Sequence, residues 1–118
     1  MADPFLQQQL SAEIPAGSAE SGQVALGGYS LVGIAVPSNW TTADLTFQAS
    51  ADDGATWYEL ADTSGLVTIP SLSPGSFVAL DPKSWIAVRS LKVRSGTESS
   101  PVNQLAAVTV TLLTRAVF

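Results

Sequence analysis

The 118-residue sequence contains neither cysteine nor histidine. Without these residues the chain cannot form a disulfide, build a zinc site from Cys and His ligands, or use a Cys or His nucleophile system. Charge is also scarce, because 13% of the residues are charged, against about a quarter in an average globular domain. Two explanations remain open: part of the surface contacts another protein, or Ser and Thr replace charged residues on an ordinary β surface.

Long apolar segments and targeting signals are lacking as well. No apolar run approaches the roughly 18 residues of a transmembrane helix, so we expect no membrane partner. Met1 to Leu10 lack the basic start and apolar stretch of a secretory signal peptide. We therefore expect a protein that is made in the cytoplasm and is not exported by the standard routes.

The net charge of −5 disfavours nucleic-acid binding, which usually requires a basic face. Three of the five basic residues nevertheless cluster, at Arg89, Lys92 and Arg94. Strand alternation places Lys92 and Arg94 on one face and Arg89 on the other. We interpret the cluster as a solvated strand face and expect no nucleic-acid partner.

The residues that are present have the pattern of a β protein. Proline and glycine recur from Pro15 to Pro101, with short β-branched and apolar runs between them. These runs predict about eight strands, at residues 23–26, 29–36, 44–50, 56–61, 66–69, 76–80, 88–95 and 104–115. Asp81 followed by Pro82 predicts one short helical turn. The predicted fold class is all-β, an antiparallel β-sandwich of jelly-roll type, with an immunoglobulin-like sandwich as the alternative.

Alternation within these runs predicts the core and one turn. Apolar residues at every second position of a strand share one face, which a sandwich buries. Asp53-Gly54 between two alternating runs predicts a β-hairpin, and such a turn explains the acidic segment without a calcium ion. The predicted core residues are Phe47, Leu91, Val93, Val108, Val110 and Leu112.

The first residues differ from the rest, and we predict an N-terminal arm at residues 1–12 and a single β-sandwich domain at residues 13–118. The arm holds three consecutive glutamines between apolar residues and is too short for a stable isolated helix. It is either a connector that docks on a neighbouring subunit or a plain terminal tail. The predicted partner-interface residues are Phe5, Leu6, Leu10, Val117 and Phe118.

No constellation of residues indicates catalysis. Most carboxylates lie at predicted turns or strand ends, and no histidine is present to activate a Ser or Lys nucleophile. We therefore expect no enzymatic activity, no catalytic residues, no metal and no cofactor. Aromatic side chains can stack on sugars, so a carbohydrate-binding module is a second hypothesis, with core packing as the alternative explanation for the same residues. These aromatic residues are Tyr29, Trp40, Trp57, Tyr58 and Trp85.

Several short segments carry a resemblance to a known group. They are Leu31-Val32-Gly33-Ile34, Pro37, Trp40-Thr41, residues 45–50, Asp53-Gly54, Trp57, residues 79–82, residues 91–97, Pro101-Val102 and Leu113-Thr114-Arg115. In this order they resemble small proteins encoded among the structural genes of tailed bacteriophages, prophages and gene transfer agents. The resemblance spans residues 14–115 and leaves out the predicted arm.

The resemblance implies a non-enzymatic virion structural protein at the particle surface. Within that group it favours the base of a head spike or a capsid decoration protein that docks on the particle and holds a fibre, with a tail or baseplate component as the alternative. The implied partners are other virion proteins, namely capsid, spike or fibre subunits, and further copies of the chain in a homo-oligomer. No catalytic residue carries over from the group. A virion part must repeat by symmetry, and low charge and apolar ends suit that requirement.

Overall fold

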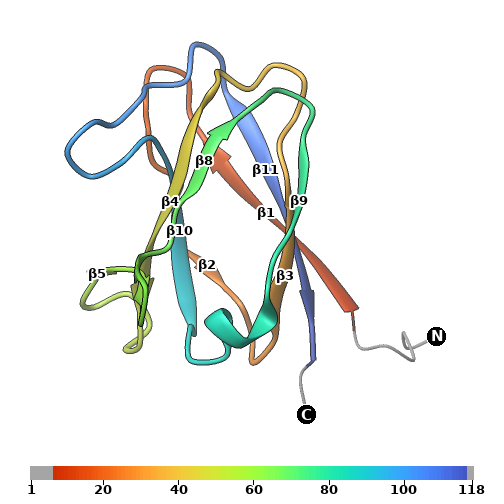
Figure 1. Cartoon of the computed structure of the whole chain (residues 1–118), viewed down its shortest axis with the longest axis vertical. Helices are drawn as coiled ribbons and strands as arrows, with labels where there is room; N and C mark the ends of the chain where they lie inside the picture. The colour runs from red at the N-terminus through yellow and green to blue at the C-terminus, as the bar shows by residue number, and fades with distance from the viewer. Residues whose placement is uncertain (1–6, 117–118) are drawn as a thin grey trace.

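The computed structural model describes residues 7–116 as a sandwich of two antiparallel sheets with a small separate hairpin (Figure 1). Sheet A contains, in spatial order, β1 (Gln7–Ile14), β11 (Val108–Arg115), β3 (Ser30–Ala35) and β9 (Phe77–Ala79). Sheet B contains β2 (Val24–Ala25), β10 (Ser90–Ser95), β4 (Ala43–Ser50) and β5 (Tyr58–Glu59), and β8 (Ile69–Leu72) also pairs with β4. The hairpin consists of β6 (Ala61–Asp62) and β7 (Gly65–Leu66).

The strands pair in a nested order along the chain. β1 pairs with β11, β2 with β10, β3 with β9 and β4 with β8, and every pair is antiparallel. A long hairpin wound in this way into two facing sheets is a jelly roll. An immunoglobulin-like sandwich would place its first and last strands in different sheets, whereas here they are neighbours in sheet A. The predicted jelly-roll type is therefore confirmed.

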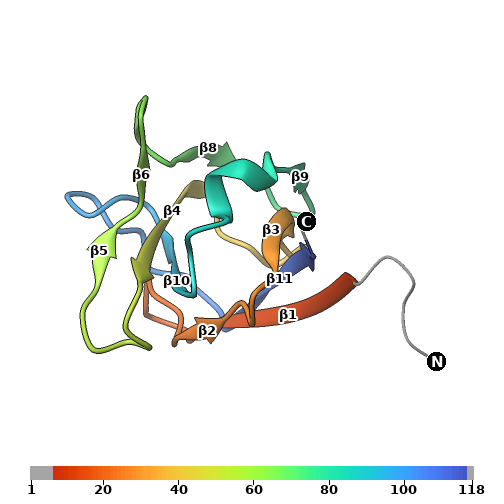
Figure 2. The same cartoon turned by 90° about the horizontal axis from the view of Figure 1, so that it is seen from below.

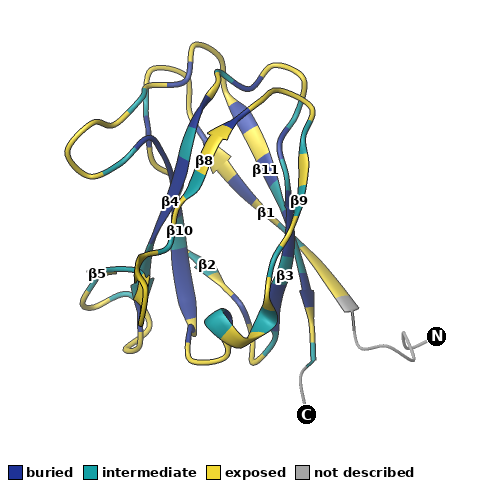
Figure 3. Cartoon of the chain, viewed as in Figure 1, coloured by how far each residue is buried: buried dark blue, intermediate teal, exposed yellow. Residues whose placement is uncertain are grey.

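The predicted core lies between the two sheets, where Figure 3 shows buried segments alternating with exposed ones along the strands. Alternation along β11 buries one set of side chains and leaves Thr109 exposed. Phe47 packs edge-on against Trp85, with ring centroids 4.8 Å apart and an interplanar angle of 87°. All six predicted core residues are buried, namely Phe47, Leu91, Val93, Val108, Val110 and Leu112.

The predicted helical turn is present as the 3₁₀ helix η1 (Pro82–Trp85). Asp81 caps it, because its carboxylate accepts a hydrogen bond of 3.0 Å from the amide of Lys83. The turn lies across one end of the sandwich, between the two sheets (Figure 2). It thereby directs the indole of Trp85 into the core, where the side chain is fully buried.

The predicted hairpin at Asp53-Gly54 is also present, as β4 and β5 pair around it. Asp53 and Gly54 adopt positive φ angles of 57° and 94°, which the turn requires. The connecting loop is longer than a two-residue turn, since the last pair joins Ala49 to Tyr58. The Oγ of Ser50 accepts a hydrogen bond of 2.8 Å from the amide of Gly54 and so stabilises the loop. The two predicted strands after this loop are divided into β5, β6, β7 and β8, and β1 is an additional strand that was not predicted, so the strands number eleven in the described residues.

The boundary predicted for the N-terminal arm is wrong within the described residues. Residues 7–12 belong to β1, which pairs along its whole length with β11, from Gln7 opposite Arg115 to Ile14 opposite Val108. The physical reason is period-two alternation, because Ala12 and Ile14 face the core and are fully buried. The run of glutamines obscures this alternation in the sequence. Residues 1–6 lie outside the described part of the chain.

Candidate functional site

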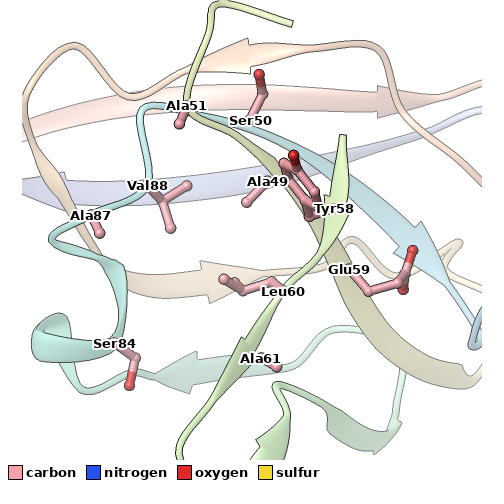
Figure 4. A pocket seen from close by; sticks show the side chains of 10 residues that line it. All are labelled: Ala49, Ser50, Ala51, Tyr58, Glu59, Leu60, Ala61, Ser84, Ala87 and Val88. Carbon is pink, nitrogen blue, oxygen red and sulfur yellow. The ribbon is translucent and has the colours of Figure 1, made fainter. Parts of the chain in front are cut away.

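An apolar hollow opens at the end of the sandwich that η1 covers (Figure 4). It has a volume of about 260 Å³ and lies between the β4–β5 hairpin and the segment from η1 to β10. Tyr58 stands at its side with 66% of its surface exposed, while Leu60 and Val88 line the interior. The residues that line it are Ala49, Ser50, Ala51, Tyr58, Glu59, Leu60, Ala61, Ser84, Ala87 and Val88. Since one charged side chain occurs among these ten, the hollow suits an apolar or aromatic-stacking group.

A second hollow of about 330 Å³ adjoins the first and shares Val88 with it. It lies between the β2–β3 turn and the segment before β10, and it includes Ile86, which is 61% exposed. Arg89 and Asp53 form an ion pair of 3.7 Å at its margin. Both side chains are mostly exposed, so this pair contributes at most about 1 kcal/mol to stability. The remaining lining residues are Ala25, Gly27, Gly28, Tyr29 and Ser90.

The basic cluster at β10 does not form a solvated face, contrary to the prediction. Arg94 is buried, and its two terminal nitrogens bind both carboxylate oxygens of Glu59. Its Nε donates a further hydrogen bond of 3.0 Å to the Oγ1 of Thr46. Lys92 is held separately, with its ammonium 4.6 Å from the centre of the Trp57 ring. The three cations of the cluster therefore have three different partners.

The interaction between Arg94 and Glu59 changes the ionisation of both groups. The hydrogen bonds from the guanidinium lower the pKa of the Glu59 carboxyl, and the positive charge adds to this effect against the opposing effect of burial. The same hydrogen bonds raise the pKa of Arg94. The sequence prediction failed here because β5 supplies Glu59 from 35 residues away, so no local pattern indicates that this part of the outer face of sheet B is covered.

The predicted aromatic residues divide between the core and the surface. Trp40 and Trp85 are buried, and the indole nitrogen of Trp40 donates a hydrogen bond of 2.9 Å to the carbonyl of Leu72. Because these two residues are buried, they cannot stack on a sugar, and a platform of all five aromatics is ruled out. Tyr58 remains exposed at the first hollow, and Trp57 is half-buried beneath Lys92.

The outer face of sheet A is nearly uncharged. Its charged residues in the described part of the chain, Glu13 and Arg115, lie at opposite ends of the sheet. Phe77 is 64% exposed, and its ring lies directly over Gly33, where a Cβ atom would approach the ring to 3.2 Å. The strand register forms two rows across the face, Gln9–Leu113–Gly33–Ala79 and Ser11–Thr111–Ala35–Phe77. Interfaces between proteins have centres depleted of charge, so this face is a candidate docking surface.

Of the predicted interface residues, Leu10 alone lies in the described residues. Phe5, Leu6, Val117 and Phe118 fall outside them. Leu10 is half-buried on β1, opposite Leu112, at the margin of the core. The candidate surfaces found instead, the two hollows and the outer face of sheet A, arise from several strands and loops and carry no local sequence motif.

Gln104 is a further structural residue that the sequence did not indicate. Its side chain is fully buried and joins the segment before β11 to the segment between β3 and β4. The side-chain oxygen accepts a hydrogen bond of 2.8 Å from the amide of Thr41, and the side-chain nitrogen donates one of 3.2 Å to the carbonyl of the same residue. Its backbone carbonyl also accepts a hydrogen bond of 2.8 Å from the amide of Gly17.

Comparison with known proteins identifies a fold relative. No protein-family model matches the chain, and no curated protein matches it in sequence. Among solved structures, the crystal structure of the SPBc2 prophage-derived protein YomS is similar to it, with a TM-score of 0.56 and 15% sequence identity. The match covers 98% of this chain and 99% of that one. The two proteins therefore share a fold over their whole lengths.

The described residues contain neither a helix that could cross a membrane nor a cluster of side chains that could hold a metal ion. None of the helical segments in residues 7–116 is long and apolar enough to cross a membrane. Across the same residues, no group of three or more Asp or Glu side chains is arranged to hold a metal ion. The acidic turn at Asp52 is instead satisfied locally, since its carboxylate accepts hydrogen bonds from the Oγ of Ser50 and the amide of Thr56.

Proposed function

We propose that this protein is a non-enzymatic structural component of a phage-type particle, and specifically the base of a head spike or a capsid decoration protein. The observation that carries the proposal is the full-length fold similarity to a prophage-derived protein. The segments between residues 14 and 115 that resemble small virion proteins of tailed phages and gene transfer agents support the same role. In that role the chain docks on the particle surface and holds a fibre.

The surface of the molecule suits permanent contact with other proteins. Tightly packed contacts need a face without unpaired charges, because each buried charge that lacks a partner is costly. The centre of the outer face of sheet A meets this requirement, since its side chains there are neutral, and exposed Phe77 is an apolar anchor on the same face. The hollows at the η1 end provide a second contact region, suited to an apolar side chain from a fibre or neighbouring subunit.

The test is to locate the protein in purified particles. Particles produced from the genome that encodes the chain are purified, the copy number of the chain relative to the major capsid protein is measured by mass spectrometry, and a tagged copy is located by electron cryo-microscopy. We expect a fixed copy number and density on the head. Density on the tail or baseplate would replace the head role with the alternative one, and absence from the particles would refute the proposal.

Two charge variants, one on each candidate docking surface, make this test more specific. Phe77→Lys introduces a charge at the exposed anchor of sheet A, and Tyr58→Lys introduces the same charge at the first hollow. Loss of particle incorporation with Phe77→Lys alone assigns docking to sheet A, and loss with Tyr58→Lys alone assigns it to the η1 end. Both side chains are mostly exposed, so both variants should keep the circular dichroism spectrum of the native fold.

The carbohydrate-binding hypothesis retains one supporting observation, the exposed ring of Tyr58 beside the first hollow. An aromatic face beside a concave site is a common arrangement for stacking on a sugar ring. A glycan array with the purified protein, repeated with Tyr58→Ala, tests this role. Binding that disappears in the variant would favour it, and a blank array would leave the aromatic ring as a protein contact.

A further inference from the structure

β1 is an edge strand that lacks the features which usually prevent a free edge from pairing with another strand. It pairs with β11 on one side, and in the described residues no strand pairs with its other side. Figure 2 shows it along the outer margin of the molecule. The strand is eight residues long, whereas β9, at the opposite edge of sheet A, has three residues and β2 has two.

Long free edges are normally protected against pairing by lysine, proline, bulges or inward-pointing charges. β1 contains no proline, no glycine and no basic residue, and Glu13 is its single charged residue. Its register with β11 is continuous, with no bulge. The edge therefore presents a regular row of backbone donors and acceptors to a further strand.

We propose that this edge pairs with the β1 edge of a second copy of the chain, in an antiparallel arrangement with its two-fold axis at Ser11. Sheet A then continues across both copies as an eight-stranded sheet. The inference concerns self-association of the chain and does not depend on its role in a particle. A symmetric contact of this kind uses the same surface patch on both copies.

The alternation of core-facing and outward-facing side chains along β1 determines which registers two copies of this strand can adopt. In an antiparallel pair, directly opposite residues point to the same side of the sheet. In β1 the core-facing positions are even-numbered, as buried Ala12 and Ile14 show, and exposed Ser11 and Glu13 face outward. Two copies can therefore pair only with the axis at a residue and not between two residues, because the latter would place core-facing side chains against outward-facing ones.

Charge and size favour the axis at Ser11. This register pairs residues 8–14 of both copies, with Ser11 opposite the same residue of the second copy. It places the carboxylate of Glu13 opposite the neutral amide of Gln9, so like charges never meet. On the core side it places half-buried Leu10 opposite small Ala12, which extends the apolar interior across the junction. The predicted interface residue Leu10 is thereby covered by the second copy.

The complete absence of cysteine allows a direct crosslinking test. Residues opposite each other in an antiparallel pair have Cα atoms about 4.5–5.5 Å apart, which lies within the range that a disulfide spans. We expect the full chain carrying Ser11→Cys to form a covalent dimer under mild oxidation at micromolar concentration. Thr109→Cys is the matched control, because Thr109 is exposed on the same face but lies on β11, one strand in from the edge. Its counterpart in the second copy is at least three strand spacings away, about 14 Å.

Charge variants test the same contact without a covalent bond. Ser11→Lys places two ammonium groups opposite each other at the axis, and we expect it to raise the dimer dissociation constant about tenfold or more in sedimentation equilibrium. Ser11→Glu should do the same, and an equimolar mixture of the two variants should form a heterodimer. Thr109→Lys should leave the dissociation constant unchanged, since it adds the same charge away from the edge.

One set of results would overturn the dimer, and another would overturn only its register. A native chain that stays monomeric at all accessible concentrations, with no faster crosslinking of Ser11→Cys than of Thr109→Cys, would overturn the proposal. Crosslinking of Leu10→Cys in preference to Ser11→Cys would overturn the register at Ser11. Thermal unfolding curves recorded for every variant establish that each one is folded, and the exposure of Ser11 predicts little change in its melting temperature.

Discussion

Removing the charge of Glu59 should destabilise the protein far more than breaking an exposed ion pair. The side chain of Arg94 is 6% exposed, and its guanidinium is bound by both carboxylate oxygens of Glu59 and by Thr46. Glu59→Gln keeps the shape of the side chain but leaves a buried cation without its counter-charge. The interaction links β10, β4 and β5, so its loss should loosen the edge of sheet B.

The magnitude follows from the burial of the two partners. Removing one member of a fully buried pair costs about 3–5 kcal/mol, and an exposed pair is worth about 1 kcal/mol or less. Glu59 retains 21% exposure, so we expect a loss in the free energy of unfolding of about 2–4 kcal/mol, somewhat below the fully buried case. A domain of this size should then melt about 10 °C lower.

Urea unfolding followed by tryptophan fluorescence measures this loss, and a double-mutant cycle with Arg94→Met isolates the coupling between the two side chains. Arg89→Met is the matched control, since it breaks the exposed Arg89–Asp53 pair. A loss below about 1 kcal/mol for Glu59→Gln, equal to that of the control, would show that solvent screens the pair and would refute the reasoning.

The contribution of Glu59 should also depend on pH. Because Arg94 lowers the pKa of the folded carboxyl below its ordinary value of 4.5, the stabilisation is fully present above pH 4.5 and is lost as the pH falls through the folded pKa. The difference in stability between the native protein and Glu59→Gln should therefore be constant near neutral pH and shrink in acid. A difference that stays constant down to about pH 2 would contradict this linkage.

Two core positions give further tests by chemical denaturation. Phe47→Ala removes a buried ring that packs against Trp85 and should cost about 3–5 kcal/mol, and a change below about 1 kcal/mol would contradict its packing. Gln104→Ala removes both side-chain hydrogen bonds to Thr41 and should cost about 2–3 kcal/mol. The Thr41 amide should then exchange with solvent faster, and unchanged exchange would show that Gln104 does not hold this loop.

The sequence was sufficient for those features that depend on neighbours in the chain. Alternation between residues 44 and 50 predicts that Leu45 and Phe47 face the core, because successive side chains of a strand point to opposite sides. Asp53-Gly54 predicts a hairpin because its positive φ angles suit these residues. Asp81 predicts the start of η1 because a carboxylate can satisfy a free amide. The all-β class and the location of the core follow from such local signals.

Sequence alone did not predict which outward faces would be covered. Alternation correctly separates Lys92 and Arg94 from the core side of β10, but Glu59 covers Arg94 through contacts between residues 35 positions apart. In the same way, Gln104 was predicted as the first residue of a strand, but it precedes β11 and its buried side chain bonds to Thr41, 63 positions away. Local periodicity specifies the side of a strand and carries no information on what packs against that side.

Tertiary structure likewise determined that residues 7–12, predicted as part of an arm, belong to a strand of the sandwich. By itself, the run that contains Gln7, Gln8 and Gln9 has too few apolar residues to order, and it has the composition of a tail. In the folded protein β11 supplies a complete partner strand, so each backbone group that faces β11 can be paired and each core-facing side chain can be buried. The sequence therefore determined the alternation of β1 and the identity of its buried residues. Only the nested pairing of the first strand with the last made that segment part of the sandwich, and within residues 7–116 it left the other edge of β1 without a partner strand.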